Sequence, residues 1–259
     1  RKNVLKNYSK LEGVYNMNYI GSKNRISKEL KPLIESYLTE NTVAYIEPFV
    51  GGANMIDKIN FHTKIGSDIH EELIELLKYA RDNSDKLPNT ISEEEYVTVK
   101  NNKDNYPKWY VGLVGFTATF GSKYFGGFAR RYDKDNNLVD VPKIAIRSIK
   151  KQSVKLQDIR FYCKSYLDYK PSDFKDCVFY LDPPYKGTLK YKHSLEYDKL
   201  YSWCLEMSKN NTVLISEYNM PEELFECVWS KDVKVGVSSQ GDIKKKKRIE
   251  KLFKVRGGL

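Results

Sequence analysis

The sequence predicts an α/β protein with a mainly parallel sheet, because short apolar runs alternate with amphipathic ones along much of the chain. The first strand is expected at 43–46 and the second at 64–68, and each leads into a loop or a helix. From Ile69 to Ala80, apolar residues recur at the spacing of one helix face. This order of strands and helices is typical of the start of a Rossmann-like sheet.

The same alternation returns in the second half of the chain as three apolar runs and one helical run. In chain order they lie at 160–163, 177–181, 194–209 (the helix) and 212–216. Two further strand-like runs, 227–238 and 248–255, flank a charged turn and predict a terminal antiparallel hairpin. Nearer the start of the chain, Pro32 is expected to mark a helix boundary or a first turn, because proline has no backbone N–H.

The middle of the chain has a different pattern and predicts an inserted domain. No run here has the character of a buried strand, and charged helical stretches flank an apolar segment at 109–120. Residues 121–155 hold nine basic and three acidic side chains, so more than half of the net charge of +10 lies there. The sequence therefore predicts a main domain formed by 1–82 and 153–259, with an inserted, mainly helical domain at 83–152.

Composition and charge narrow the classes of function. A pI of about 9.1, with 20 tyrosines and 11 phenylalanines, suits a partner whose phosphates can be neutralised and whose bases can be stacked, although an AT-rich genome gives a similar composition. The four cysteines form no CxxC pair, and with three histidines they give no zinc-site spacing, so no metal is expected. No apolar run is long enough for a membrane span and no signal peptide is evident, which favours the cytoplasm.

The strand expected at 177–181 ends in Asp182-Pro183-Pro184-Tyr185. Two prolines cannot continue a strand, so the strand has to end there. Open α/β sheets bind ligands at the carboxyl ends of their strands. Asp182 and a proline carbonyl can accept the two hydrogens of an exocyclic amino group, and Tyr185 can stack on the ring that carries it. The alternative is a proline-rich turn that only closes a buried strand.

The first strand runs into a glycine-containing loop, EPFVGGAN at 47–54. Gly51 and Gly52 lack side chains, so a ligand can approach their backbone closely. Asp68 stands at the end of the second strand, where a carboxylate can bind the two hydroxyls of a ribose. Because GxGxxG is absent, a nucleoside without pyrophosphate fits better than a dinucleotide, and a dehydrogenase is not favoured. The alternative for the double glycine is a simple tight turn.

Four motifs resemble, in the same order, those of the Dam-type family of DNA adenine-N6 methyltransferases. They are Tyr19-Ile20-Gly21-Ser22-Lys23, Glu47-Pro48-Phe49-Val50-Gly51-Gly52-Ala53, Cys163-Lys164-Ser165-Tyr166 and Asp182-Pro183-Pro184-Tyr185. Weaker similarity continues through 215–218 and 248–253. DPPY alone also occurs in some RNA methyltransferases, whereas its combination with the other motifs is specific. The resemblance implies a Rossmann-like methyltransferase sheet and identifies the inserted domain as a target-recognition domain.

The methyl donor of that family is S-adenosylmethionine, which becomes S-adenosylhomocysteine. The resemblance implies that the cofactor-binding residues are Tyr19, Gly21, Ser22, Lys23, Glu47, Pro48, Phe49, Gly51, Gly52, Ala53, Asp68, Ile69, Ser165, Tyr166 and Asp182. The catalytic residues that it implies are Asp182, Pro183, Pro184 and Tyr185. Asp182 and the Pro183 carbonyl would accept the hydrogens of adenine N6, so that its lone pair points at the sulfonium methyl. Neither a metal nor a covalent enzyme intermediate is needed.

The resemblance also implies double-stranded DNA as the partner, with the target base flipped out of the helix. The candidate DNA-binding residues are Lys123, Tyr124, Phe125, Arg130, Arg131, Lys143, Arg147 and Lys150. The last three recur on one face of a helical run and can follow a phosphate backbone, with a solvated helix face as the alternative. Tyr124 or Phe125 is the candidate wedge for the gap that the base leaves, and Arg130 or Arg131 the candidate guanine contact. Residues 121–131 match the family only loosely, so the usual GATC target is a guess.

The predicted function is thus site-specific methylation of adenine N6 in DNA, and two alternatives stay open. One is the same transfer to cytosine N4 or to an RNA base, and the other is a non-catalytic nucleic-acid-binding protein. The inserted domain favours duplex DNA, and the intact Asp182 and glycine loop argue against a non-catalytic protein. The expected setting is the cytoplasm of a bacterial or phage-infected bacterial cell. The sequence leaves open whether a cognate restriction endonuclease exists and whether a monomer or a weak dimer acts.

Overall fold

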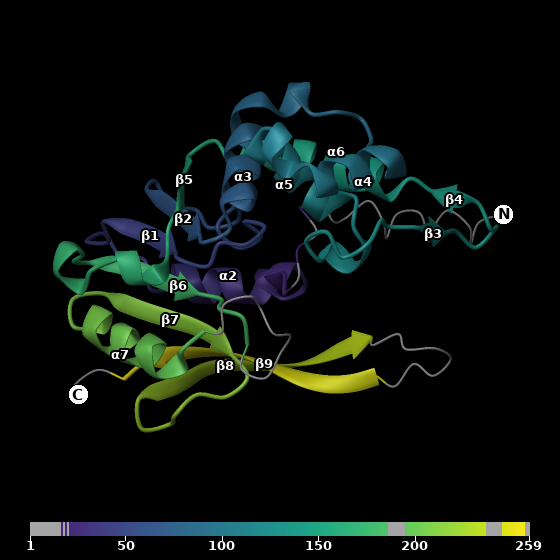
Figure 1. Cartoon of the computed structure of the whole chain (residues 1–259). Helices are drawn as coiled ribbons and strands as arrows, with labels where there is room; N and C mark the ends of the chain where they lie inside the picture. Colours follow the sequence, from purple (N-terminus) through teal and green to yellow (C-terminus); the bar gives the residue numbers. More distant parts are fainter. Residues whose placement is uncertain (1–16, 18, 20, 186–194, 237–244, 257–259) are drawn as a thin grey trace. The chain divides into compact units, whose positions relative to one another are not determined.

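The computed structural model describes residues 17, 19, 21–185, 195–236 and 245–256 (Figure 1). These residues belong to two compact units, each assembled from two stretches of the chain. The first unit comprises Arg1–Pro32 and Val50–Lys164, and the second comprises Leu33–Phe49 and Ser165–Leu259. The division expected from the sequence, into a main domain and an inserted recognition domain, is one of function and stays a prediction.

The first unit contains a parallel strand pair and a group of helices. β2 (Lys64–Asp68) runs parallel to β5 (Ile159–Cys163), so both strands end at the same edge. Figure 1 shows the helices of this unit gathered together: α3 (Glu71–Asn83), α4 (Glu93–Asn101), α5 (Lys108–Thr117) and α6 (Val141–Gln152). α3 packs against α5 at close range, since a Cβ on Gly112 would lie 2.1 Å from the Glu72 carbonyl oxygen. A larger residue at position 112 would push these two helices apart.

Helix caps and a short hairpin define the rest of this unit. Ser92 and Glu95 form a capping box at the start of α4, and the Asp140 side chain accepts the Lys143 N–H at the start of α6. β3 (Arg131–Tyr132) pairs with β4 (Leu138–Val139) in a short antiparallel hairpin. The 3₁₀ turns of the unit are η1 (Lys23–Arg25), η2 (Ser84–Lys86), η3 (Lys103–Asn105), η4 (Phe120–Ser122) and η5 (Ser153–Lys155).

The expectation for Pro32 was wrong. α2 (Ser27–Glu35) continues through this proline, which is its sixth residue, and ends three residues later. A proline inside a helix removes the hydrogen bond to the carbonyl four residues earlier, here that of Lys28, and its ring crowds that carbonyl. Lys28 and Pro32 are both exposed, so water can take the place of the missing donor. The buried face of α2, with Leu30 and Ile34, outweighs the loss of one bond.

The second unit carries the larger set of strands. β1 (Ala44–Glu47), β6 (Cys177–Leu181) and β7 (Thr212–Glu217) run parallel, with β6 in the middle. β9 (Lys245–Val255) lies antiparallel between β7 and β8 (Phe225–Gly236), which confirms the predicted terminal hairpin. Part of the charged turn expected between them, 237–244, lies outside the described residues. Two 3₁₀ turns, η6 (Tyr166–Asp168) and η7 (Pro171–Asp173), precede β6.

The core of this unit explains why its strand sequences are so apolar. All five residues of β6 are buried, as expected for a central strand covered on both faces. α7 (Tyr197–Ser208) packs beside β7, as Figure 1 shows, and buries Leu200 and Trp203. The fold-class prediction is confirmed: this is an α/β protein whose seven strands, β5-β2 in the first unit and β1-β6-β7-β9-β8 in the second, are mixed and end in antiparallel strands. Within the described parts of the chain, no helix combines the length and the apolar character that a membrane crossing requires.

Candidate active site

The glycine loop of the first unit is shaped by contact with Tyr19. Gly51 has a φ of 49°, a left-handed conformation that favours glycine, and a Cβ there would lie 2.8 Å from the Tyr19 ring. The Val50 N–H donates to the Ser67 carbonyl (2.8 Å), which joins the loop to β2. A side chain at position 51 would therefore displace either the ring or the loop. The backbone of Gly51 and Gly52 is thus buried against Tyr19, which packs where side chains would otherwise lie.

Asp68 closes this loop at the end of β2. Its Oδ2 accepts the Gly51 N–H (3.2 Å) and its Oδ1 accepts the His70 N–H (3.0 Å). Burial raises the pKa of Asp68, and these two backbone hydrogen bonds partly oppose that rise. A carboxylate oxygen can accept more than one hydrogen bond, so both oxygens retain capacity for hydroxyl donors. The next residue, Ile69, is 61% exposed and offers an apolar surface beside the carboxylate.

The N-terminal motif forms a tight turn in the same unit. The Ser22 hydroxyl accepts the Asn24 N–H (3.3 Å) at the start of η1, and Gly21 has a φ of 79°. The Lys23 side chain is buried and its ammonium donates to the Gly21 carbonyl (3.1 Å). The cofactor-binding role that the resemblance implies for Lys23 stays a prediction.

Gln152, which the sequence did not single out, holds the glycine loop from behind. It is buried at the end of α6, and its Nε2 donates to the carbonyls of Gly52 (3.0 Å) and Ala53 (3.3 Å). Its Oε1 accepts the Met17 N–H (2.8 Å), and the Asn54 amide donates to the Met17 carbonyl (3.0 Å). The loop and the start of the N-terminal motif are thus connected through one amide side chain. No short motif could have indicated this, because Gln152 and Gly52 are 100 residues apart.

Two aromatic residues of the predicted inserted domain, Phe116 and Tyr124, pack against His70, which follows Asp68 by two residues. His70 lies edge-on to Tyr124 (4.5 Å between ring centroids) and to Phe116 (5.1 Å), and Phe116 in turn contacts Tyr19 (5.7 Å). Burial lowers the pKa of His70. Phe125 is buried, so it can reach DNA only if its present packing opens, whereas Tyr124 is half-buried.

The predicted basic contacts to DNA are mostly exposed. Lys123 and Arg131 are exposed, and Arg130 is also exposed but pairs with Glu93. On α6, Lys143 and Arg147 are exposed and Lys150 is half-buried. These positions suit contacts with a phosphate backbone, and their role stays a prediction.

In the second unit, Asp182 and Pro183 directly follow the carboxyl end of β6. Pro183 is buried and Asp182 is half-buried, immediately after five buried residues. On the neighbouring strand, Glu47 is buried and its Oε1 accepts the Tyr45 hydroxyl hydrogen (2.7 Å). The same edge of parallel strands thus carries both predicted acids of this unit, one from β1 and one after β6.

The end of the DPPY motif is held by side chains from three elements of this unit. The Tyr185 hydroxyl donates to Glu250 Oε2 on β9 (2.9 Å). The Tyr197 hydroxyl, at the start of α7, lies 2.7 Å from the Pro184 carbonyl oxygen and 2.8 Å from Glu217 Oε2 at the end of β7. Burial, and then the charges of nearby carboxylates, raise the pKa of Tyr185, so this hydroxyl keeps its proton and acts as a donor.

The remaining predicted cofactor residues of this unit form an aromatic surface. Phe49 and Tyr166 stack with ring centroids 5.4 Å apart and an angle of 29° between the rings. The Ser165 hydroxyl accepts the Leu167 N–H (3.2 Å) and so fixes the turn that presents Tyr166. Tyr166 is buried and Phe49 is half-buried, so Phe49 is the ring of this pair that a planar heterocycle can reach.

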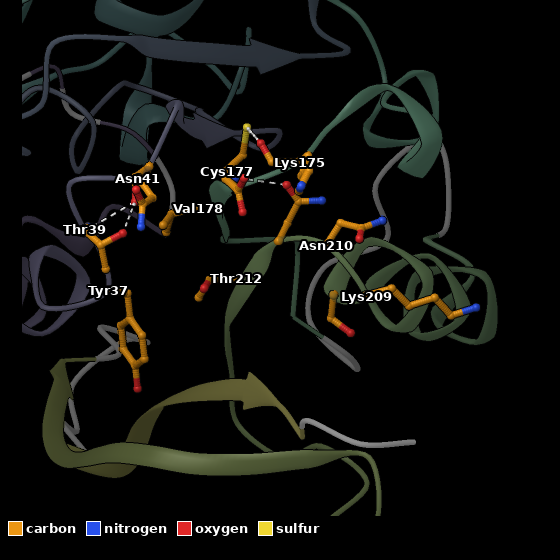
Figure 2. A pocket seen from close by; sticks show the side chains of 13 residues that line it. Tyr37, Thr39, Asn41, Lys175, Cys177, Val178, Lys209, Asn210 and Thr212 are labelled. Carbon is orange, nitrogen blue, oxygen red and sulfur yellow. Dashed lines mark hydrogen bonds between the residues drawn. The ribbon is translucent and has the colours of Figure 1, made fainter.

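A pocket of about 420 Å³ lies at the other end of the strands of the second unit (Figure 2). Its lining includes Cys177 and Thr212, the first residues of β6 and β7. The Asn211 side chain accepts the Cys177 N–H (3.0 Å) and donates to the Phe174 carbonyl (3.0 Å). These polar groups hold the chain where the strands begin, so this pocket is separate from the turn at Asp182. No group of three or more metal-ligating side chains occurs among the residues that the structure describes.

Comparison with known proteins gives a family match and a set of similar solved structures, two of which are described below. The family model for the D12 class N6 adenine-specific DNA methyltransferases matches residues 19–203. The rRNA methyltransferase aviRa from Streptomyces viridochromogenes is 9% identical, with a TM-score of 0.43 over 93% of this chain and 90% of that chain. SMU.472, a putative methyltransferase complexed with SAH, is 14% identical, with a TM-score of 0.29 over 86% of this chain and 55% of that chain. No curated protein matches the sequence.

Proposed function

The chain belongs to the D12 class of N6 adenine-specific DNA methyltransferases, and on this premise we propose that it methylates adenine N6 within a short specific sequence of double-stranded DNA. The observation that carries the proposal is the turn after β6, where Asp182 and Pro183 stand at the carboxyl end of a buried parallel strand. A carboxylate and a carbonyl free of competing N–H donors suit the two hydrogens of an amino group.

The residues of the first unit fit a nucleoside cofactor such as S-adenosylmethionine. Asp68 has acceptor capacity for ribose hydroxyls, and the Gly51 N–H that it accepts joins it to a loop packed against Tyr19. Exposed Ile69 provides an apolar surface for a base. When bound, S-adenosylmethionine supplies an electrophilic methyl group on a sulfonium and leaves as S-adenosylhomocysteine.

The role proposed for Asp182 and the Pro183 carbonyl is orientation of the acceptor. The lone pair of adenine N6 is delocalised into the ring, so the free amino group is a weak nucleophile. Two acceptors on its hydrogens favour a pyramidal nitrogen whose lone pair leaves the ring plane. The Asp182 carboxylate also stabilises the positive charge that develops on the nitrogen, and the proton then passes to it or to water.

The proposed DNA contacts lie on the helical part of the first unit. Lys143 and Arg147 on α6 are exposed and would contact phosphates, with Lys123 and Arg131 as further contacts. Tyr185 would stack on the extruded adenine, which contributes about 1–3 kcal/mol per base. A GATC-like target, the cytoplasm of a bacterial cell and action as a monomer or weak dimer complete the proposal.

The test uses tritiated S-adenosylmethionine, unmethylated duplex DNA and the wild-type protein beside Asp182→Ala. We expect label in N6-methyladenine at one short sequence, and a rate at least about 100-fold lower for Asp182→Ala. Label found in N4-methylcytosine, or only in RNA, would mean that the acceptor is not adenine in DNA. Label that Asp182→Ala incorporates at the wild-type rate, or a wild-type protein that does not bind the cofactor, would contradict the proposal.

A further inference from the structure

We propose that Tyr197 and Glu250 are positioning residues for the methyl transfer step, which fix the main chain and the ring of the DPPY turn; this inference rests on the proposed function. The two residues come from α7 and β9, and neither belongs to the four sequence motifs. Each contacts the turn through one hydrogen bond, and together they hold its last two residues.

Tyr197 controls the direction of the Pro184 carbonyl. Its hydroxyl lies 2.7 Å from that carbonyl oxygen and 2.8 Å from Glu217 Oε2, and both of these atoms are acceptors. The single hydroxyl hydrogen is therefore shared between them. Glu217 is 1% exposed and also accepts the Tyr218 N–H (2.7 Å) through its other oxygen, so the tyrosine hydroxyl is held against a fixed carboxylate. Burial, and then the bond to Glu217, raise the pKa of Tyr197, which keeps the hydroxyl protonated.

Because of the two prolines, the direction of the Pro184 carbonyl restricts the neighbouring peptide planes. The φ angles of Pro183 and Pro184 are set by their rings, so little rotation remains around either residue. Fixing the Pro184 carbonyl thus fixes the peptide plane that follows, and restricts the peptide plane before it. That earlier plane contains the Pro183 carbonyl, which is one of the two proposed acceptors for the amino group. A shift of about 1 Å in such a group can cost a factor of about 100 in rate.

Glu250 controls the orientation of the Tyr185 ring. Its Oε2 accepts the Tyr185 hydroxyl hydrogen (2.9 Å), and the Tyr218 ring meets the Tyr185 ring edge-on at 4.4 Å and 86°. A hydrogen bond at the far end of the ring and an aromatic contact along it leave one orientation. A base stacking on a ring fixed in this way loses less orientational freedom than one stacking on a mobile ring.

The experiment compares single hydroxyl deletions on one helix. Tyr197→Phe removes the donor to Pro184, whereas Tyr201→Phe removes a hydroxyl one turn later that makes no hydrogen bond within the described residues. The ring of Tyr201 packs against the rings of Tyr197 and Phe225. We expect Tyr197→Phe to lower the single-turnover transfer rate about 10- to 100-fold. Affinities for S-adenosylmethionine and DNA should stay within about two-fold, and Tyr201→Phe should match the wild type in all three measurements.

Glu250 offers an independent check by conservative replacement. Glu250→Gln keeps an oxygen acceptor for the Tyr185 hydroxyl and should retain most of the transfer rate, whereas Glu250→Ala should lose it together with part of the DNA affinity. Combined with Tyr197→Phe, Glu250→Ala should be non-additive, because both act on one turn.

Two results would overturn the inference, and they differ from failure of the proposed function. Wild-type transfer to DNA with an unchanged rate for Tyr197→Phe would remove the positioning role and leave the function intact. If Tyr197→Phe lowers the transfer rate, the cofactor affinity and the thermal stability together, the residue has a general structural role instead. Absence of transfer to DNA by the wild type would overturn the proposed function and the inference together.

Discussion

The glycine loop of the first unit and the DPPY turn of the second are built in different ways. The loop is held by backbone groups: the Gly51 N–H donates to Asp68, and the carbonyls of Gly52 and Ala53 accept from Gln152. The turn is held by hydroxyl groups of tyrosines, which donate to a carbonyl and to a carboxylate. Both regions therefore depend on side-chain hydrogen bonds, but the loop also requires that Gly51 and Gly52 carry no side chain, because Tyr19 occupies that space.

This difference suits the two tasks that we propose. A loop that binds a cofactor needs a stable shape, and Gly51, with a left-handed φ angle and no side chain, lets the loop pack closely against Tyr19. A turn that orients an amino group needs acceptors fixed in direction, and buried side-chain hydrogen bonds provide that. We therefore expect changes in the loop to alter cofactor affinity and changes around the turn to alter the transfer rate.

The largest effect that this comparison predicts is expected for a substitution at Gly51. Gly51→Ala places a Cβ within 2.8 Å of the Tyr19 ring and forces a residue with a side chain into a φ of 49°. We expect the affinity for S-adenosylmethionine to fall at least about 100-fold, since the Cβ would displace either the Tyr19 ring or the loop that donates to Asp68. Equilibrium dialysis with the labelled cofactor measures this loss.

Gly121→Ala is the matched control for Gly51→Ala. Gly121 has a φ of 62°, but no atom lies within 4 Å of the position that its Cβ would take. It therefore carries the same kind of backbone strain, about 1–2 kcal/mol, without the steric conflict. Cofactor affinity should stay at the wild-type value. An equal loss in both variants would mean that strain, and not the steric conflict, controls binding.

A smaller effect, of about tenfold, is expected at Asp68. Asp68→Asn keeps the shape of the side chain but removes the charge that strengthens hydrogen bonds from hydroxyl donors. Because burial raises the pKa of Asp68, the wild-type affinity should weaken as the pH falls through that raised value. Titration calorimetry over a range of pH should find this dependence in the wild type and not in Asp68→Asn.

The stability of Asp68→Asn gives a second, opposite signature. Folding raises the pKa of this group, so its contribution to stability is complete below the pKa of the unfolded chain and is lost as the pH rises through the folded value. At neutral pH the ionised Asp68 therefore disfavours the folded state. Asp68→Asn removes this cost, but its amide nitrogen cannot accept the backbone N–H that one carboxylate oxygen accepts in the wild type. Its stability in urea relative to the wild type should therefore improve as the pH rises through the folded pKa of Asp68, and a difference that does not change with pH would contradict the raised pKa.

The smallest effect is expected at Ala53, where the loop departs from an all-glycine run. Ala53 is buried and has a φ of 56°, which costs an L-residue free energy that glycine does not pay. Ala53→Gly should raise the free energy of unfolding by about 0.5–1 kcal/mol, since the relief of strain exceeds the added entropy of the unfolded chain. Urea denaturation checks this value, and a clear loss of stability would contradict it.

The sequence was a good guide to features that depend on neighbours in the chain. Strand β6 and the turn after it were predictable because five apolar residues and two prolines leave few conformations. The terminal hairpin and the helix after Asp68 were predictable for the same reason. The error at Pro32 arose because the exposure of the carbonyl that a proline leaves unpaired depends on packing, which a local pattern does not contain.

The supports of the two regions could not be predicted in this way. Gln152 and Glu250 act over 100 and 65 residues of chain, and a buried glutamine or glutamate has no distinctive spacing. Weak similarity marked the segments that contain Glu217 and Glu250 but gave them no role. The glycine loop could be found because its requirement is local, whereas the residues that hold the DPPY turn became apparent only when α7 and β9 were in place.

The most direct test of this division measures cofactor affinity and single-turnover methyl transfer side by side for Gly51→Ala and Tyr197→Phe. The account predicts that Gly51→Ala loses affinity but regains much of its rate at saturating S-adenosylmethionine. It predicts that Tyr197→Phe keeps its affinity and stays slow at every cofactor concentration. If the two variants lose affinity and rate in the same proportion, the loop and the turn do not divide the work as proposed.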